Sequence, residues 1–184
     1  FIISGSGSLN FLQKVTTNDL RKLRFGQAQY SLMCNEEGGI IDDLIIYKKR
    51  NDYLLVVNAS NREKNLKWLK KHQNSNVLIE DISDSIGLLA VQGPKSRKIL
   101  NQLFDIDLNK LSFYHFQYGS IKGFNVMISR TGYTGELGYE IFVKSKNLIE
   151  LWKNILYTGK KFGISPAGLG CRDTLRMEMR YHLY

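Results

Sequence analysis

Two distant stretches of the sequence repeat the same order of structural signals. Residues 56–71 (VVNASNREKNLKWLKK) and 141–156 (IFVKSKNLIELWKNIL) each begin as an apolar strand, pass through a polar cap and continue as an amphipathic helix with one Trp. Apolar residues at helical spacing in such stretches usually face the core. The repeat predicts an α+β fold of two similar halves, residues 1–100 and 101–184, each a small antiparallel sheet with helices.

The other strand and helix signals agree with this plan. Strands are expected where Ile, Leu, Val and Tyr gather, at residues 44–47, 53–57, 77–80, 86–91, 125–129 and 139–143. Helices are expected at residues 8–15, 61–72, 95–103, 145–157 and 169–180, with N-caps at Ser60 or Asn61 and at Ser145. Residues 50–52 (RND) predict a hairpin between the first two strands. Because hairpins and runs replace strict strand–helix alternation, antiparallel sheets are favoured over a doubly wound fold.

The chain is strongly basic, with 26 Lys and Arg against 17 acidic residues and a formal net charge of +9. Such an excess fits solvated lysine-rich faces, nucleic acid, an acidic protein partner or an anionic small molecule. The positive residues are scattered, without a compact basic helix, a zinc motif or an aromatic ribonucleoprotein motif. Nucleic acid is therefore not expected as a partner.

Composition also limits the cellular compartment and the metal chemistry expected of the chain. The 2 Cys make neither a disulfide framework nor a multi-Cys zinc site, and the 3 His lack metal-ligand spacing, so no metal is expected. The longest apolar runs are strand-length, so no membrane span is expected. No signal peptide is visible, and a reducing interior compartment is expected. The chain begins with Phe1 rather than Met, which indicates a piece of a longer protein.

Two neighbouring acids follow a glycine turn in residues 38–43 (GGIIDD). Side chains alternate across a strand, so Asp42 and Asp43 point to opposite faces. One of them can then lie in water while the other faces a pocket or the core, where a carboxylate is partly desolvated and can orient or accept a proton. The alternative is an acidic pair that merely caps a hairpin.

A glycine-rich loop follows a predicted strand at residues 130–140 (RTGYTGELGYE), with Gly at every third position. Backbone can approach a ligand closely in such a loop. Tyr133 offers a ring face, and Glu140 offers an acceptor for a planar pair of donors. The alternative is an ordinary glycine-rich hairpin loop.

The last predicted helix lies in residues 168–180 (GLGCRDTLRMEMR). An apolar stripe expected to face the core and a positive stripe run along it, made of Cys171, Leu175 and Met179 and of Arg172, Arg176 and Arg180, respectively. Three like charges on one face repel unless they are paired or bind an anion. Arg172 stands at the helix start, where the dipole disfavours a cation, so a carboxylate partner is expected there.

Together these segments resemble the aminomethyltransferase, or T-protein, family of the glycine cleavage system. The resemblance covers the whole chain, and its motifs appear in family order at residues 15–19 (VTTND), 30–43 (YSLMCNEEGGIIDD), 54–61 (LLVVNASN), 89–94 (LAVQGP), 132–136 (GYTGE) and 168–184 (GLGCRDTLRMEMRYHLY). Residues 130–136 (RTGYTGE) look like the transferase branch rather than the iron–sulfur-assembly relatives. The tail domains of dimethylglycine and sarcosine dehydrogenases share the fold, so a folate-binding module of such a protein stays open as the alternative.

The resemblance implies a tetrahydrofolate-dependent transfer. The family takes an aminomethyl group from the lipoyl arm of the carrier H-protein, passes its methylene to tetrahydrofolate and releases ammonia. It implies the aminomethyltransferase folate-binding fold, and a location in the cytoplasm of a bacterium or the mitochondrial matrix of a eukaryote. The basic surface would suit an anionic folate tail and an acidic carrier.

The resemblance also assigns residues by their match to family motifs. Asp43 is implied to be the catalytic acid. Folate-binding residues are implied at Glu140, Arg172, Tyr133, Tyr30, Tyr47 and Asn58. An N-terminal stretch and a C-terminal β-rich domain of the family lie outside this sequence. The chain is therefore expected to be a fragment and to be inactive by itself.

Overall fold

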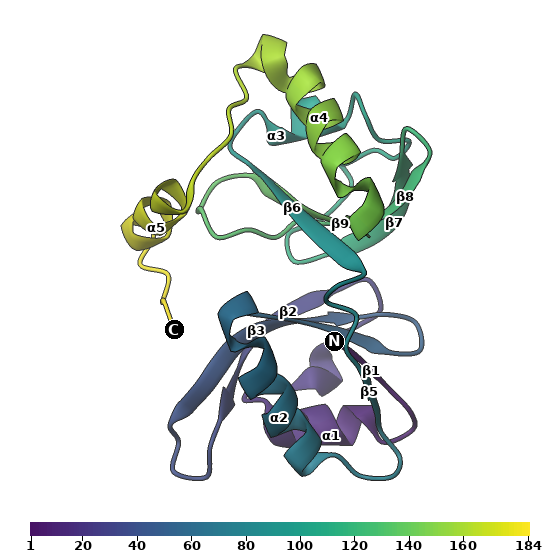
Figure 1. The fold of residues 1–184 in the computed structure, drawn as a ribbon, viewed down its shortest axis with the longest axis vertical. Coiled ribbons are helices and arrows are strands. Elements are labelled where there is room, and N and C mark those ends of the chain that lie inside the picture. The colour runs from purple at the N-terminus through teal and green to yellow at the C-terminus, as the bar shows by residue number, and fades with distance from the viewer. The chain divides into compact units, whose positions relative to one another are not determined.

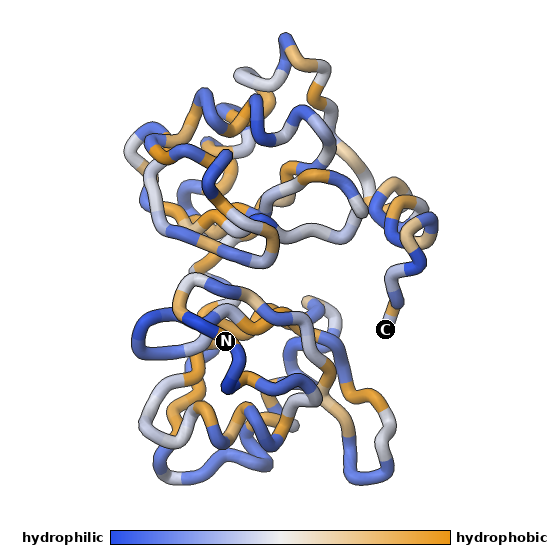
Figure 2. The backbone as a smooth tube through the Cα atoms, turned by 180° about the vertical axis from the view of Figure 1, so that it is seen from behind, coloured by the Kyte–Doolittle hydropathy of each residue, from blue (hydrophilic) through white to orange (hydrophobic).

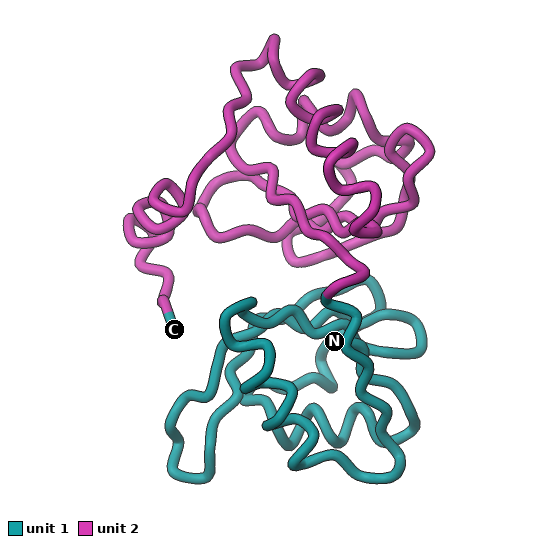
Figure 3. Tube along the Cα trace, in the orientation of Figure 1, with its two compact units in different colours: residues 1–83, 184 teal, residues 84–183 magenta.

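The computed structural model describes all residues from Phe1 to Tyr184 and divides them into two compact units (Figure 3). Unit 1 holds residues 1–83 together with Tyr184, and unit 2 holds residues 84–183. The sequence placed the division near residue 100, whereas the strand from Ile86 to Gln92 pairs with a strand of unit 2. The pairing of residues 86–92 with residues 138–144 leaves no local signal in the sequence, so local patterns put the boundary too late in the chain.

Unit 1 is a five-stranded antiparallel sheet with two helices (Figure 1). Its strand order is β2-β3-β4-β1-β5. Its elements in chain order are β1 (Ile2–Ser4), α1 (Ser8–Val15), η1 (Leu20–Lys22), β2 (Ala28–Cys34), β3 (Ile40–Lys48), β4 (Tyr53–Val57), η2 (Ala59–Asn61), α2 (Arg62–His72) and β5 (Leu78–Glu80).

The core of unit 1 lies between the sheet and its helices. Leu12 of α1 and Leu69 of α2 are fully buried beside Ile46 of β3, so the two helices cover one face of the sheet. Alternation along β3 puts Leu44 and Ile46 on this core face. The predicted β3–β4 hairpin is confirmed, and Lys48 pairs with Tyr53 at its end.

Unit 2 is a four-stranded antiparallel sheet with the order β6-β9-β8-β7 (Figure 1). Its elements are β6 (Ile86–Gln92), α3 (Ser96–Leu100), β7 (Phe116–Ile121), β8 (Phe124–Ser129), β9 (Gly138–Lys144), η3 (Ser145–Asn147), α4 (Leu148–Gly159), η4 (Lys160–Phe162) and α5 (Leu169–Glu178). Buried Leu151 and Ile155 of α4 pack with Ile141 of β9 in its core. The antiparallel α+β architecture expected from the sequence is confirmed.

The internal repeat is confirmed as a structural one. In unit 1, β4 runs through η2 into α2, and in unit 2, β9 runs through η3 into α4. Strands β1, β2 and β7 have no counterpart among the predicted strands. The apolar spacing of the repeat placed Trp152 of α4 in the core, and this is wrong, because Trp152 is 40% exposed.

Asn61 is the N-cap residue of α2, as predicted, whereas Ser145 begins η3 and Asn147 takes the N-cap position of α4. Neither Asn61 before α2 nor Asn147 before α4 makes a side-chain cap hydrogen bond. Asn61 instead donates its amide to the Asp42 carboxylate at 3.1 Å, and the Ser145 hydroxyl donates to the Asp84 carbonyl. Both side chains therefore donate to tertiary acceptors and do not accept from the backbone N–H groups at a helix start.

Helix α5 forms as predicted, but its apolar stripe does not face the core. No residue of α5 is buried, Cys171 is exposed, and Met179 just beyond it is 46% exposed. Figure 2 shows hydrophilic and hydrophobic residues mixed along this last helix. The core expectation failed because periodicity reveals an apolar side but not what covers it. No helix of the chain has the length and apolar character needed to cross a bilayer.

Candidate functional site

The two neighbouring acids on β3 point to opposite faces of the unit 1 sheet, as alternation requires. Asp42 is 0% exposed and shares the core face with Leu44 and Ile46. Asp43 is half-buried on the other face. Asp43 is therefore the acid that stands outside the unit 1 core and can meet a ligand.

Asp43 is held by two neutral donors. The Tyr30 hydroxyl donates to Asp43 Oδ2 at 2.9 Å, and the Asn58 amide donates to Asp43 Oδ1 at 2.6 Å. Tyr30 reaches Asp43 from β2 as a diagonal neighbour, since Leu32 is the residue that pairs with Asp43. Both oxygens of Asp43 therefore have a set orientation, and the group includes three of the residues assigned by the family resemblance.

Tyr47 stands apart from this group. It lies four residues after Asp43 on β3, and its side chain is 0% exposed. The family resemblance assigned it to the lining of a pterin pocket. Its ring is covered in this structure, and that assignment stays a prediction.

Glu140 lies at the middle of β9, half-buried and opposite Ser129 of β8. The Thr131 hydroxyl donates to Glu140 Oε2, and the same Thr131 oxygen lies 3.0 Å from the Ser129 hydroxyl. An ionised carboxylate has about four acceptor sites, so this contact orients the group without exhausting its acceptor capacity. Thr131 escaped the sequence reasoning because a short polar residue in a loop has no signal of its own.

Tyr114 is a second neighbour of Glu140 that sequence reasoning missed. Burial raises the pKa of the Tyr114 hydroxyl, and the negative charge of Glu140 raises it further. Tyr114 also has a φ of 57°, a left-handed conformation that side chains seldom adopt. The phenol stays protonated beside the carboxylate over an extended pH range.

The side chain of Gln92 explains two glycines of the loop after β8. A Cβ atom added at Gly132 would lie 2.1 Å from Gln92 Oε1, and one added at Gly138 would lie 1.9 Å from the same atom. The Gln92 amide donates to the carbonyls of Thr131 and Tyr139, each at 3.2 Å. The glycines thus make room for a side chain that fastens both ends of the loop, not only for a turn.

The same loop supports α5. The Arg172 guanidinium lies 4.6 Å from the centre of the Tyr133 ring, and Tyr181 stacks on that ring at 5.7 Å. The Tyr133 hydroxyl donates to the His182 carbonyl. Arg172 therefore has an aromatic ring and not the carboxylate partner that the sequence predicted, because the dipole argument ignored the ring that the loop brings to the helix start.

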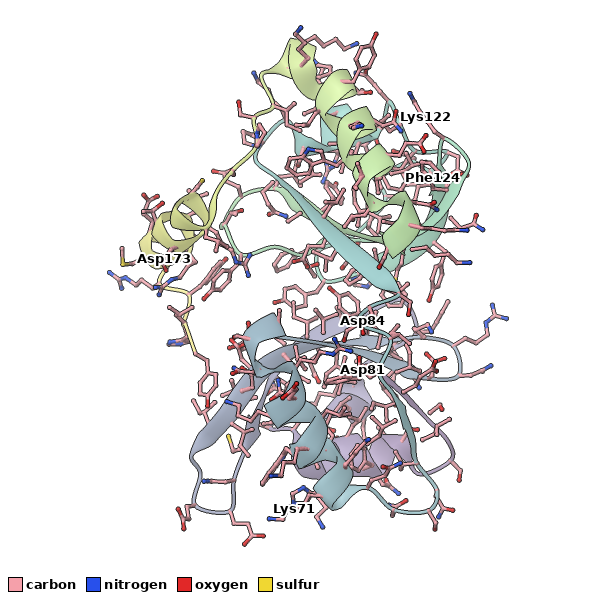
Figure 4. All side chains as sticks on the ribbon, in the orientation of Figure 1. Lys71, Asp81, Asp84, Lys122, Phe124 and Asp173 are labelled. Carbon is pink, nitrogen blue, oxygen red and sulfur yellow. The ribbon has the colours of Figure 1, made fainter.

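The positive stripe of α5 is partly neutralised within the helix. Arg176 Nη2 lies 2.6 Å from Asp173 Oδ1, and Arg176 Nε donates to the same oxygen (Asp173 is labelled in Figure 4). Asp173 therefore serves as an ion-pair partner and not as a helix cap. No group of three or more His, Cys, Asp or Glu in the chain is arranged to hold a metal ion.

One family model matches residues 1–184, and its description is the GCVT N-terminal domain. The chain belongs to this family. The motifs found in the sequence are thus motifs of the GCVT N-terminal domain, and the match spans both units described above.

Two curated relatives of this GCVT domain are both named aminomethyltransferase. The chain is 48% identical over 186 residues to an aminomethyltransferase of Chloroherpeton thalassium, covering 100% of this chain and 51% of the relative. It is 50% identical over 184 residues to an aminomethyltransferase of Bacillus subtilis, covering 99% of this chain and 51% of the relative. The chain spans about half the length of the curated relatives it matches.

Solved structures agree on the fold. The glycine cleavage system aminomethyltransferase T of Bartonella henselae matches with a TM-score of 0.85 and 30% identity, over 99% of this chain and 48% of that one. A heterotetrameric sarcosine oxidase of Corynebacterium sp. U-96 matches with a TM-score of 0.66 and 16% identity, over 91% of this chain and 82% of that one. The second likeness shows the fold alone.

Proposed function

We propose that this GCVT domain is part of a tetrahydrofolate-dependent aminomethyltransferase of the glycine cleavage system. The methylene of an aminomethyl group carried on the lipoyl arm of H-protein passes to tetrahydrofolate, and ammonia is released. The observation that carries the proposal is Asp43, a half-buried carboxylate outside the unit 1 core whose two oxygens are oriented by Tyr30 and Asn58. The names of the curated relatives support the reaction class.

Three assigned residues, Glu140, Tyr133 and Arg172, offer contacts that suit a folate. A pterin ring presents adjacent N–H donors, and Glu140 is an oriented carboxylate that can accept them as a pair. Tyr133 adds a ring, and Arg172 adds a permanent positive charge for an anionic group. We assign pterin recognition to Glu140, and support of the folate to Tyr133 and Arg172.

Asp43 has the chemical role in this proposal. A carboxylate beside the folate nitrogens can accept one of their N–H bonds and hold the nitrogen for attack. The same charge balances the positive charge that develops on the transferred methylene. Asn58 and Tyr30 keep the carboxylate in one orientation, so little reorganisation is needed during the reaction.

The experiment uses a full-length protein that contains residues 1–184. It is incubated with tetrahydrofolate and with H-protein loaded with the aminomethyl group, and ammonia and methylene-tetrahydrofolate are measured. Both products should form in equal amounts and only when folate and loaded H-protein are both present. Folate binding without any product from loaded H-protein would instead favour a folate-binding module of another enzyme, which no observation on this chain favours.

A further inference from the structure

We propose that Asp42 is a positioning residue, which acts through Asn58 to hold the Asp43 carboxylate in place. The inference rests on the catalytic role proposed for Asp43 and adds a residue that the site assignments leave out. All three residues lie in unit 1, Asp42 and Asp43 on β3 and Asn58 directly after β4.

Asp42 is surrounded by amides in the core of unit 1. Its oxygens accept from Asn58 Nδ2 at 2.8 Å, from Asn61 Nδ2 at 3.1 Å and, through a short contact, from Asn65 Nδ2. Its side chain has no Lys, Arg or His partner. Carboxylates are rarely buried without a cation, because only strong hydrogen bonds offset the lost hydration. An apolar residue would pack here at lower cost, so the arrangement calls for a reason beyond packing.

Asn58 connects the buried acid to the outer one. Its Nδ2 atom lies 2.8 Å from Asp42 Oδ1 and 2.6 Å from Asp43 Oδ1, which matches the two N–H bonds of one amide group. These two bonds are called the Asn58 bridge below. At one end of the bridge the Asn58 amide is held by Asp42, a fully buried carboxylate. The other N–H of Asn58 therefore keeps its direction toward Asp43.

Asn61 and Asn65 differ from Asn58 in one respect that makes them useful controls. Both donate to Asp42, but neither contacts Asp43. A purely structural role for Asp42, tying β3 to η2 and α2, would depend on all three amides alike. A positioning role depends on Asn58 alone, since only the Asn58 bridge reaches Asp43.

The test compares Asp42→Asn with Asn61→Ala in the full-length protein. Asp42→Asn replaces one acceptor oxygen with an amide nitrogen, so the Asn58 bridge loses its anchor. We expect kcat to fall roughly 10-fold while the KM for tetrahydrofolate changes less than about 2-fold, because placement and not binding is disturbed. Asn61→Ala should lower the melting temperature similarly and leave kcat unchanged.

A double-mutant cycle locates the effect. In an Asn58→Ala background, Asp42→Asn should have no further effect on kcat, because the route from Asp42 to Asp43 is already cut. If Asp42→Asn does not fold, Asp42→Ser carries the same comparison, since it leaves a small uncharged side chain in the core.

The outcomes separate this inference from the proposed function. An Asp42 variant that is destabilised like Asn61→Ala but keeps its kcat would overturn the positioning role and leave the role of Asp43 intact. Additive kcat losses for Asp42 and Asn58 variants would overturn it as well. Full turnover in Asp43→Asn would remove the proposed function of the site, and the inference built on it.

Discussion

The central carbon of the Arg172 guanidinium lies 4.6 Å from the centre of the Tyr133 ring. The Tyr181 ring stacks on the same ring with the two centres 5.7 Å apart, so Tyr133 contacts both the start of α5 and the segment that follows it. Arg172, a charged residue of α5, therefore has an aromatic ring as its partner and not a carboxylate or solvent. The arrangement also places the two proposed folate-binding residues Arg172 and Tyr133 in contact with each other.

Arg172→Lys keeps the charge but removes the planar group that stacks on the ring. We expect tetrahydrofolate binding to weaken by about 2- to 30-fold, the range of a cation–π contact worth roughly 0.5–2 kcal/mol. Isothermal titration of the full-length protein checks this. Arg176→Lys is the matched control, because Arg176 pairs with Asp173 one turn along the same helix. Equal losses in the two variants would contradict a specific role for the Arg172–Tyr133 contact.

Asp43→Asn should lower turnover by about two to four powers of ten while tetrahydrofolate still binds, because a positioned charge or base is lost. Single-turnover kinetics and a folate titration measure the two effects separately. Asp42→Asn should reduce turnover far less, since Asp42 faces the core. Equal losses from the two substitutions would show that the roles of the acids are assigned wrongly.

Glu140→Gln replaces one acceptor oxygen with a donor amide, so a pair of pterin N–H groups would meet one acceptor and one opposing N–H. A buried donor left without a partner costs roughly 1–3 kcal/mol, or about a 5- to 150-fold loss of affinity. A folate analogue without the glutamate tail should show the same loss, because Glu140 is proposed to recognise the pterin. The control is Glu136→Gln, an exposed glutamate of the same loop. Undiminished affinity of the variant for the tail-less analogue would rule this role out.

Gly138→Ala should destabilise the loop through Gln92. The new Cβ would lie 1.9 Å from Gln92 Oε1, so the Gln92 side chain must leave its hydrogen bonds to Thr131 and Tyr139. The expected loss in unfolding free energy is about 1–3 kcal/mol, measured by urea denaturation of the full-length protein.

Gln92→Ala supplies the partner variant for a cycle with Gly138→Ala. In the Gln92→Ala background the glycine substitution should cost much less, because the obstructing atom is gone. Gly168→Ala, where nothing lies within 4 Å of the added Cβ, is the control for glycine replacement as such. Additive losses in the cycle would mean that Gly138 is needed for a reason other than Gln92.

The ion pair between Asp81 and Arg62 gives unit 1 an acid-sensitive contact. Arg62 Nε donates to Asp81 Oδ2 at 2.8 Å, and the Ser83 hydroxyl and amide donate to Asp81 Oδ1 (Asp81 is labelled in Figure 4). Burial alone would raise the pKa of Asp81, but the bonds from Ser83 and Arg62 outweigh it and lower the pKa from 3.8 to about 2. Because the folded pKa is the lower one, this stabilisation is present above the unfolded pKa and disappears as pH falls through the folded one.

Asp81→Asn should therefore lower the unfolding free energy at pH 7, by less than about 1 kcal/mol because the pair lies at the surface and stays in partial contact with water. The difference from the unsubstituted protein should shrink as pH falls from 3.8 toward 2, followed by thermal unfolding at each pH. Glu36→Gln, at an exposed turn residue, should show no such pH-dependent difference. A difference that persists unchanged at the lowest pH would contradict the assigned pKa.

Local patterns were enough to predict much of the fold, and the sequence motifs were enough to predict the family. The hairpin after β3, the repeated strand–helix step and the antiparallel sheets all follow from apolar spacing and turn residues within a few positions of one another. Strands β1, β2 and β7 were not predicted. Only the place of β1 depends on strands distant in sequence, since β1 pairs with β4 and β5, whereas β2 and β7 each pair with the next strand of the chain.

The sequence alone determined that Asp42 and Asp43 face opposite ways, because the side-chain period of a strand is two. Only the tertiary structure decided that Asp42 faces the core and that Asn58 contacts both acids. Which face of a sheet is inside depends on where α1 and α2 pack, and that choice is made by contacts between residues far apart in the chain. The partner of Arg172 was decided in the same way, since the loop that brings Tyr133 to α5 lies more than thirty residues earlier.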